Sequence, residues 1–582
     1  MKWTIHILMT LAVLLSSRSG AAAADPMRSE TAILSAIPAD CWGFVQINNL
    51  RALDDKLVTF LEQIKLPPMR LIEMLQARLN LGPKITYDGS LAVVFTPADT
   101  LADMGTRTVL VFPCASVESL LSDFPTEKIR DNLWRAELVW GPTYVGQQGE
   151  FAVFGTTEQA ANIVLNSKKR INTIITGPLP EEFKRSDANI WINVQAFVAS
   201  PAMNIAPGEN DPSGGGGSIF GSGSILAMNR DTLKQIESAH LGVHLNAARI
   251  KITGTIQPVR DSVLAALLDF GSPADPSLLA LLPNQPFIVA AAGRATAAQA
   301  QIKAAEFDKF LDSETIASGT DPEKLAQFRQ ALRAVIGAIR DGAWALSTQP
   351  QSPEGLVAAV GAFKLTDAQA WLADVQKAAD LLGEGFFVNE SAKRFYNSVR
   401  YQPNADTITG VPVHHLVLDL IETSSDTPAR KIDYSAALGP AKKVIQIAAV
   451  DSQTVVVCVG DHPRVMAALL ASARGLAPGL DRYAGLAKVK PFLPDDNNVF
   501  VMFLPEELIR IGRTLARMQD KVESFGHQMP KSDTPIGATL ARSPAGCRIE
   551  VVIPIDLAAA LKSMFLDPRK TPSTIDPPPE GN

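Results

Sequence analysis

Short apolar or alternating runs, each bounded by glycine, proline or polar residues, recur along the first half of the chain and predict β-strands. The expected strands are Trp42–Ile47, Leu91–Phe95, Thr108–Phe112, Tyr144–Gln147, Phe151–Phe154, Ile190–Val194, Leu241–Leu245 and Arg249–Ile256. Apolar residues at helical spacing predict helices over Leu50–Ile64, Pro68–Leu81, Ser116–Ser122, Thr157–Lys168, Ile225–Ser238 and Val259–Phe270. Ser116 and Thr157 each supply a side-chain oxygen that can cap the first turn of a helix.

The second half carries the same kinds of pattern. The expected strands are Phe287–Ala292, Trp344–Ser347, Leu356–Phe363, His414–Leu420, Ile445–Ala449, Thr454–Val459, Asn498–Leu504, Gly537–Ala541 and Arg548–Ile553. The expected helices are Ala304–Leu311, Pro322–Arg340, Thr366–Leu382, His462–Arg474, Glu506–Phe525 and Asp556–Phe565.

Short links between neighbouring strands fix the direction of pairing. Tyr144–Gln147 is followed closely by Phe151–Phe154, and Leu241–Leu245 by Arg249–Ile256. A parallel return needs a crossover of about a dozen residues, so both pairs are expected to be antiparallel hairpins. The predicted class is therefore α+β, with a mainly antiparallel sheet covered by helices in each half.

The second half also repeats the order of the first. Three segments have counterparts: Ile37–Asp40 with Leu282–Gln285, Asp88–Ala92 with Asp341–Ala345, and Phe151–Gly155 with Val455–Gly460. The order is kept while the spacing changes, which indicates a duplicated domain and not a short-period solenoid.

These patterns divide the 582 residues into two similar domains. The expected parts are a signal peptide (1–24), a first α+β domain (25–270), a linker (271–277), a second α+β domain (278–566) and a disordered tail (567–582). Within the first domain, the glycine-rich segment 207–224 is expected to be a flexible loop.

The N-terminus has the three regions of a secretory signal. Lys2 precedes an apolar run from Trp3 to Leu15, and the small residues Ala21 to Ala24 follow. Cleavage after Ala24 is expected, because the apolar run is shorter than the ~20 residues that span a bilayer. The expected localisation is exported, either periplasmic or extracellular. No transmembrane span is expected after cleavage, since polar residues interrupt the later apolar segments.

Composition excludes one class of partner. The chain is 46% hydrophobic and 20% charged, with a formal net charge of −6. Such a balance offers no basic field to hold a phosphate backbone, so no nucleic acid partner is expected.

Cys41, Cys114, Cys458 and Cys547 are the four cysteines. An exported protein can form disulfides, and four cysteines allow three pairings. Buried free thiols are an equally good interpretation. No pair has the short spacing of a zinc site.

Few residues suggest chemistry. The histidines after the signal are His240, His244, His414, His415, His462 and His527. His240 and His244 share a face of one strand but lie ~13 Å apart along it, too far to bind one metal. The acidic pairs Glu181-Glu182 and Glu506-Glu507 follow prolines, so stabilisation of a helix N-terminus explains them. Asp495-Asp496 lacks the pattern of a calcium loop.

Sequence motifs of known enzymes are also missing. The glycine run 214–217 lacks the Gly-Lys-Ser/Thr ending of a phosphate-binding loop, and the chain has no Gly-x-Ser-x-Gly sequence. We therefore assign no catalytic, cofactor-binding or metal-binding residue and expect no cofactor.

Three features together resemble exported bacterial proteins that contain a domain of unknown function. They are Ile37–Asp40 before a strand, the strand–strand–helix segment Leu91–Ser122, and the hairpin Tyr144–Gly155 that leads into Thr157. The resemblance extends over both halves and implies no catalytic residues. The second half departs from it in an extra stretch around Phe386–Ile408.

The function expected from the sequence is binding. We expect a non-catalytic protein of the cell envelope that binds an unidentified ligand or protein partner, because reactive constellations are missing from the sequence. The alternative is an extracytoplasmic hydrolase whose site is assembled from residues distant in sequence.

Overall fold

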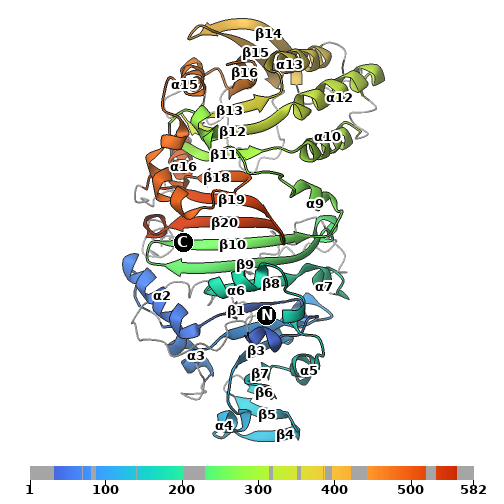
Figure 1. The fold of residues 1–582 in the computed structure, drawn as a ribbon, viewed down its shortest axis with the longest axis vertical. Helices are drawn as coiled ribbons and strands as arrows, with labels where there is room; N and C mark the ends of the chain where they lie inside the picture. The colour runs from blue at the N-terminus through green and yellow to red at the C-terminus, as the bar shows by residue number, and fades with distance from the viewer. Residues whose placement is uncertain are drawn as a thin grey trace, which may run out of the picture. The chain divides into compact units, whose positions relative to one another are not determined.

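The computed structural model of the chain describes residues 32–68, 70–79, 87–138, 141–201, 230–312, 319–349, 355–383, 386, 396–420, 442–518 and 532–559. They form an α+β fold with a large antiparallel sheet (Figure 1). The chain divides into two compact units. Unit 1 comprises 1–273, 493–499 and 538–555, and unit 2 comprises 274–492, 500–537 and 556–582. The predicted signal peptide, the loop 207–224 and the tail 567–582 lie outside the described residues.

The sheet of unit 1 runs in the order β4–β5–β6–β7–β3–β2–β1–β8–β9–β10–β20–β19. Its strands are β1 (Gly43–Ile47), β2 (Leu91–Phe95), β3 (Thr108–Pro113), β4 (Thr126–Arg130), β5 (Leu133–Leu138), β6 (Gly141–Gln148), β7 (Phe151–Gly155), β8 (Ala188–Asn193), β9 (Ile236–Asn246), β10 (Arg249–Pro258), β19 (Ile536–Ser543) and β20 (Gly546–Pro554).

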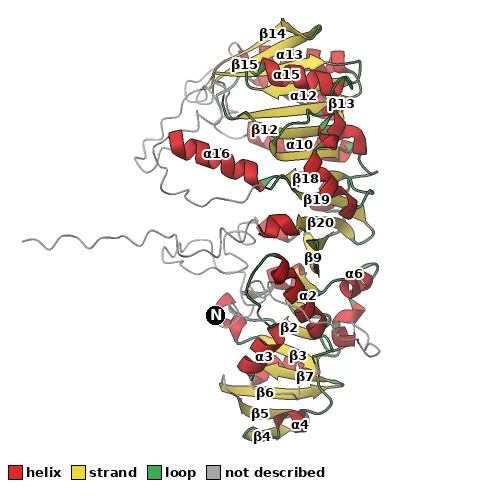
Figure 2. Ribbon diagram, turned by 90° about the vertical axis from the view of Figure 1, so that its left-hand side faces the viewer, coloured by secondary structure: helices red, strands yellow, loops and turns green. Residues whose placement is uncertain are grey.

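Both faces of the central strands of unit 1 are buried. In β1, Phe44 and Val45 point to opposite faces and belong to different apolar clusters. The helices α2 (Leu50–Gln63), α3 (Leu71–Leu79) and α4 (Val117–Leu121) cover the face of Val45. The face of Phe44 is covered by η1 (Ala32–Ser35), α5 (Glu158–Asn166) and α6 (Leu179–Arg185). Figure 2 shows α6 on a different side of the strands from α2 and α3.

The remaining helices of unit 1 are short. They are η3 (Leu101–Gly105), η4 (Ile171–Thr173), α7 (Val194–Val198), α8 (Arg230–Leu233) and α9 (Val263–Leu267).

The sheet of unit 2 runs in the order β14–β15–β16–β17–β13–β12–β11–β18. Its strands are β11 (Phe287–Arg294), β12 (Ile339–Thr348), β13 (Val357–Leu365), β14 (Tyr396–Ile408), β15 (Val411–Leu420), β16 (Lys442–Ala449), β17 (Thr454–Val459) and β18 (Val499–Phe503). Its helices are η6 (Pro276–Leu281), α10 (Ala297–Leu311), α12 (Pro322–Gly337), α13 (Ala368–Gly383), α15 (Pro463–Ala473), η8 (Leu480–Arg482), η9 (Ala484–Lys488), η10 (Lys490–Phe492) and α16 (Pro505–Met518).

The pairing orders of the two units correspond strand for strand. The order β4–β5–β6–β7–β3–β2–β1–β8 in unit 1 has the same sequence of connections as β14–β15–β16–β17–β13–β12–β11–β18 in unit 2. For example, β2 lies between β1 and β3, and β12 lies between β11 and β13.

The predicted hairpins and two predicted helix starts are confirmed. β6 pairs antiparallel with β7, and β9 with β10. The side chains of Ser116 and Thr157 accept hydrogen bonds from amides in the first turns of α4 and α5.

The helix predicted over Ile225–Ser238 is wrong over its described part. Only Arg230–Leu233 is helical, and Ile236 begins β9. The backbone of β9 pairs with β8 on one side and β10 on the other, and this long-range pairing overrides the local apolar spacing. Val194, expected at the end of a strand, instead begins α7.

The C-terminal hairpin departs from the predicted division of the chain. Residues 538–555, expected within a second domain 278–566, are grouped with unit 1. The reason is that β20 pairs with β10 over eight residues, from Arg249 opposite Pro554 to Ile256 opposite Cys547. The division between 273 and 274 lies within the expected linker.

Among the described residues, no helix is both long enough and apolar enough to cross a bilayer.

Candidate binding face on the sheet of unit 1

One face of unit 1 becomes polar where the sheet passes from β8 to β20. The register places His240 opposite Thr255 and Thr255 opposite Arg548. In the next row, Asn189 lies opposite Gly242, Gly242 opposite Thr253, and Thr253 opposite Glu550. His244 lies opposite Lys251. We call this set the polar face: Asn189, His240, His244, Lys251, Thr253, Thr255, Arg548 and Glu550.

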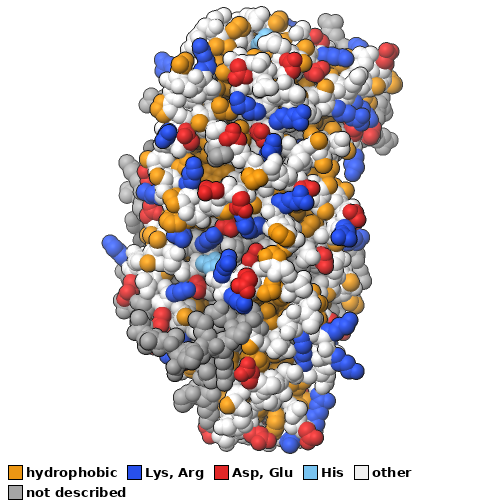
Figure 3. Space-filling view, viewed as in Figure 1, with side chains coloured by type: hydrophobic (Ala, Val, Ile, Leu, Met, Phe, Trp, Pro, Cys, Tyr) orange, Lys and Arg blue, Asp and Glu red, His pale blue; other side chains and the backbone are white. Residues whose placement is uncertain are grey.

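The polar face is open to solvent at its basic side chains. The side chain of Lys251 is 27% exposed and that of Arg548 is 26% exposed. Figure 3 shows Lys and Arg, Asp and Glu, and a histidine gathered over the strands that Figure 1 labels β9, β10 and β20. A ligand can therefore reach Lys251 and Arg548 without opening the fold, whereas Asn189, His240, Thr255 and Glu550 are buried.

Helix α6 adds Glu182 to this face. Glu181 and Glu182 both lie in the first turn of α6, as the helix-end explanation requires. They differ in direction, because successive helical residues are rotated by about 100°. Glu181 forms a surface ion pair with Lys184 (2.7 Å), whereas Glu182 turns toward the sheet. Stabilisation of the helix N-terminus therefore explains the presence of an acidic residue at Glu182 but does not explain its contacts with the sheet.

Glu182 and His240 form a buried polar pair. Nε2 of His240 donates to Oδ1 of Asn189 (2.9 Å), and the ring stacks on Phe183 with a centroid distance of 4.4 Å. Its Nδ1 lies 3.6 Å from Oε2 of Glu182, which also accepts a hydrogen bond from the Thr255 hydroxyl (3.0 Å). Burial raises the pKa of Glu182, but the interactions with His240 and Thr255 outweigh it and hold this pKa below the usual value.

Lys251, Arg548 and Glu550 form a chain of opposite charges beside this pair. Nζ of Lys251 lies 2.5 Å from Oε2 of Glu550. Nε of Arg548 lies 3.5 Å from Oε1 of Glu550, and its Nη2 donates to Asp496 (2.7 Å). Asp496, from the pair Asp495-Asp496, thus takes part in an ion pair of unit 1. The charges on this part of the face neutralise one another.

Ser186, Asp187 and His244 lie near one another but do not form a relay. The hydroxyl of Ser186 lies 3.3 Å from Nε2 of His244, a close approach that Gly242 permits because it has no Cβ. The same hydroxyl donates to the Glu182 carbonyl (3.0 Å), and Ser186 is only 2% exposed. Asp187 accepts hydrogen bonds from Lys56 and the Leu245 amide. These contacts give Ser186, Asp187 and His244 a structural role, and they expose no nucleophile to solvent.

We predict that stability falls below pH ~6.5, the ordinary pKa of histidine. Burial lowers the pKa of His244, and the nearby Asp187 does not restore it. The unfolded chain therefore binds more protons than the folded chain as the pH falls through this value, which destabilises the fold. Glu182 adds a second loss at lower pH, as protonation of its depressed carboxyl removes its charge.

Thermal unfolding at pH 7.5 and pH 5.5 measures the first effect. The unfolding midpoint should drop at pH 5.5, and His244→Asn should reduce the drop. An equal drop of the unfolding midpoint in the wild type and in His244→Asn would show that His244 does not contribute to the loss of stability at pH 5.5.

The other residues considered from the sequence lie apart from the polar face or pack within the fold. The four cysteines are free and buried, so no disulfide joins them, and burial raises the pKa of Cys458 to about 12 and that of Cys547 to about 11. His462 precedes α15, and His414 and His415 lie in β15. His527 is outside the described residues.

The pair Glu506-Glu507 lies in the first turn of α16, in unit 2. Glu507 is buried and accepts hydrogen bonds from Thr348 (2.7 Å) and from Nε of Arg510 (3.0 Å). Glu506 accepts one from the Ser532 amide (2.7 Å). These contacts connect α16 to β12 and to the segment before β19, which is a structural role.

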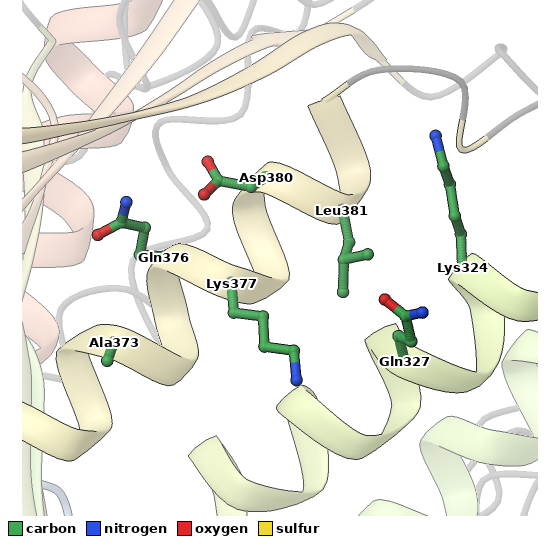
Figure 4. A pocket seen from close by; sticks show the side chains of 7 residues that line it. All are labelled: Lys324, Gln327, Ala373, Gln376, Lys377, Asp380 and Leu381. Carbon is green, nitrogen blue, oxygen red and sulfur yellow. The ribbon is translucent and has the colours of Figure 1, made fainter.

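A groove in unit 2 lies between α12 and α13 and encloses about 500 Å³. Figure 4 shows Lys377 and Leu381 pointing toward α12, whereas Gln376 and Asp380 point away from it. Because its polar groups diverge, the groove has no constellation that suggests chemistry.

The sequence carries a local signal for the polar face. Polar residues alternate along three strands, at His240 and His244, at Lys251, Thr253 and Thr255, and at Arg548 and Glu550. Alternation marks one face of a strand, but only the register places these residues side by side.

Among the described residues, no group of three or more His, Cys, Asp or Glu side chains is placed to hold a metal ion. No family model, curated protein or solved structure matches this chain.

Proposed function

We propose that this chain is a non-catalytic binding protein and that the polar face of unit 1 is its binding surface. The observation that carries the proposal is the row of hydrogen-bonding side chains across β9, β10 and β20, from which Lys251 and Arg548 reach solvent, in a sheet whose central strands are buried on both faces. A polar surface on a rigid sheet is preorganised, which lowers the entropy lost on binding.

Binding fits these residues better than hydrolysis does. Glu182 is ionised and held by His240 and Thr255, and Glu550 is paired with Lys251 and Arg548. A general acid at neutral pH needs a raised pKa, whereas that of Glu182 is lowered. The extracytoplasmic hydrolase is therefore the second candidate.

Native mass spectrometry of the protein isolated from its own host tests the proposal. The wild-type protein should carry a co-purifying ligand or partner, and Arg548→Met should lose it. The control is Arg542→Met, which removes an exposed ion pair with Asp269 on the same hairpin. Retention by Arg548→Met would contradict the proposal. Turnover abolished by Glu182→Gln in a folded protein would favour the hydrolase.

We also propose that the protein is exported, at the periplasm or the cell exterior, like the family that it resembles. The charged, apolar and small-residue regions of the first 24 residues support this. We predict that the exported protein begins at Asp25. N-terminal mass spectrometry measures this directly, and an intact Met1 in the membrane fraction would contradict it.

We further propose that the two halves arose by duplication. Support comes from the three repeated sequence segments and from the correspondence of eight successive strands between the units. In this interpretation β19 and β20 are the counterparts of β9 and β10, since each pair is the last hairpin of its half.

A further inference from the structure

The sheet of unit 2 carries an apolar patch that its own helices leave partly uncovered. Two neighbouring rows of side chains on one face form the patch, across β11, β12, β13 and β17. Trp344 is 43% exposed and Val459 is 37% exposed, which is unusual for large apolar side chains on the inner strands of a sheet. The six residues that we call the sheet patch are Val289, Ala291, Trp344, Leu346, Ala359 and Val459.

The corresponding positions of unit 1 are buried. The sequence repeat makes Leu91 the counterpart of Trp344, and the strand register then makes Phe154 the counterpart of Val459. Leu91 and Phe154 are only 6% and 4% exposed. They belong to an apolar cluster that α2 covers with a stripe of three leucines, Leu50, Leu53 and Leu57.

Helix α10, the counterpart of α2, lacks this stripe. Each helix follows the corresponding strand, β1 or β11, and begins after an N-cap side chain, Asn49 for α2 and Thr296 for α10. Counted from these caps, alanine occupies all three leucine positions, at Ala297, Ala300 and Ala304. Helix α10 therefore does not supply the large side chains that cover these positions in unit 1.

Neighbouring helices mark the limits of the patch. The row of Trp344 continues to Val457, which packs in the apolar cluster under α13. Two residues beyond Leu346 on the same face, the hydroxyl of Thr348 donates a hydrogen bond to Glu507 of α16 (2.7 Å). The uncovered surface is therefore bounded by α13 and α16.

We propose that the sheet patch binds an amphipathic helix of a partner protein, whose large aliphatic side chains have the i, i+3, i+7 spacing of the α2 leucines. Unit 1 provides the argument for this occupant, because there a helix with that stripe covers the same positions. The six residues of the patch are uncharged, so an apolar helix face matches them, and burial of Trp344 and Val459 drives the association. A second copy of the chain does not offer its α2 stripe, since Leu50, Leu53 and Leu57 are buried. The site is independent of the binding function proposed for the polar face.

Isothermal titration of the full chain with a helical peptide tests this site. The probe is a peptide of residues 49–64 with Ala52→Asp, joined to Lys56 by a side-chain lactam that keeps the isolated peptide helical. Residues 52 and 56 are exposed in α2, so the lactam lies away from the leucine stripe. The control peptide has the same lactam and carries alanine at the three stripe positions, as Leu50→Ala, Leu53→Ala and Leu57→Ala.

The leucine peptide should bind the wild type, and the alanine peptide should not. Trp344→Ala should weaken the binding of the leucine peptide at least tenfold, as expected for a central aromatic contact. Val459→Thr keeps the branched shape that strands favour and should also weaken it, which provides a second test if Trp344→Ala does not fold. The control Leu476→Ala removes a 70% exposed leucine elsewhere in unit 2 and should bind like the wild type.

Three results would overturn the proposal. Absence of binding by the leucine peptide, or equal binding by the alanine peptide, would show that the patch does not recognise a leucine stripe. Binding that neither Trp344→Ala nor Val459→Thr weakens would place the peptide elsewhere, for example in unit 1 in place of α2. Self-association of the wild type in analytical ultracentrifugation that Trp344→Ala abolishes would show that the patch joins two copies of the chain. Because Arg548→Met should bind the peptide like the wild type, none of these results bears on the polar face.

Discussion

Replacing Gly546 with alanine should lower the free energy of unfolding by about 3 kcal/mol and displace β20 from β10. Gly546 begins β20 with φ at 124°, a conformation that residues with a Cβ rarely adopt. A Cβ at this position would also lie 2.3 Å from the carbonyl oxygen of Ile256 in β10. Backbone of a paired strand cannot move aside cheaply, so the conformational and steric costs add. Chemical denaturation measures the loss.

Gly149 provides the matched control. It lies in the turn between β6 and β7 with φ at 58°, and a Cβ there would have no atom within 4 Å. Gly149→Ala should therefore cost only the conformational term, about 1–2 kcal/mol. Similar losses for the two variants would mean that the contact with Ile256 does not hold the C-terminal hairpin in place.

Replacing Trp191 with alanine should cost about 3–5 kcal/mol. Trp191 lies in β8 with 2% exposure, and its ring stacks on Phe44 with a centroid distance of 5.7 Å. The same apolar cluster contains Phe183 of α6, the helix that carries Glu182. The cavity left by the missing indole ring should therefore loosen α6, which lowers stability and also weakens ligand binding.

Trp344, which is 43% exposed in β12, is the control. Trp344→Ala should cost much less, because most of its surface already contacts solvent. Chemical denaturation compares the two, and equal losses would contradict the assignment of the Trp191 cluster as the core that supports the polar face.

The sequence predicted elements whose signal is local. The strands Leu91–Phe95 and Phe151–Gly155 are short, fully buried apolar runs, and the side chain of Thr157 caps its helix in the way its position indicates. Strand β4 escaped prediction because it is a fully exposed strand of mostly polar residues at the end of the sheet, so it has no apolar side to detect.

The division of the chain and the candidate site depend on long-range pairing, which local patterns do not contain. No spacing in the sequence indicates that β20 pairs with β10, about 300 residues earlier, although this pairing brings Glu550 beside Lys251. Glu181 and Glu182 look equivalent in sequence as well. Only the packing of α6 on β9 shows that one lies at the surface and the other faces His240.

Hydrogen–deuterium exchange tests the binding surface most directly. The protein isolated with its co-purifying ligand is compared with the same protein after the ligand has been removed. Amides of 240–255 in β9 and β10 and of 546–554 in β20 should exchange more slowly in the ligand-bound sample. Protection confined to other segments, such as α12 and α13, or an unchanged exchange pattern, would contradict the assignment of the polar face as the binding site.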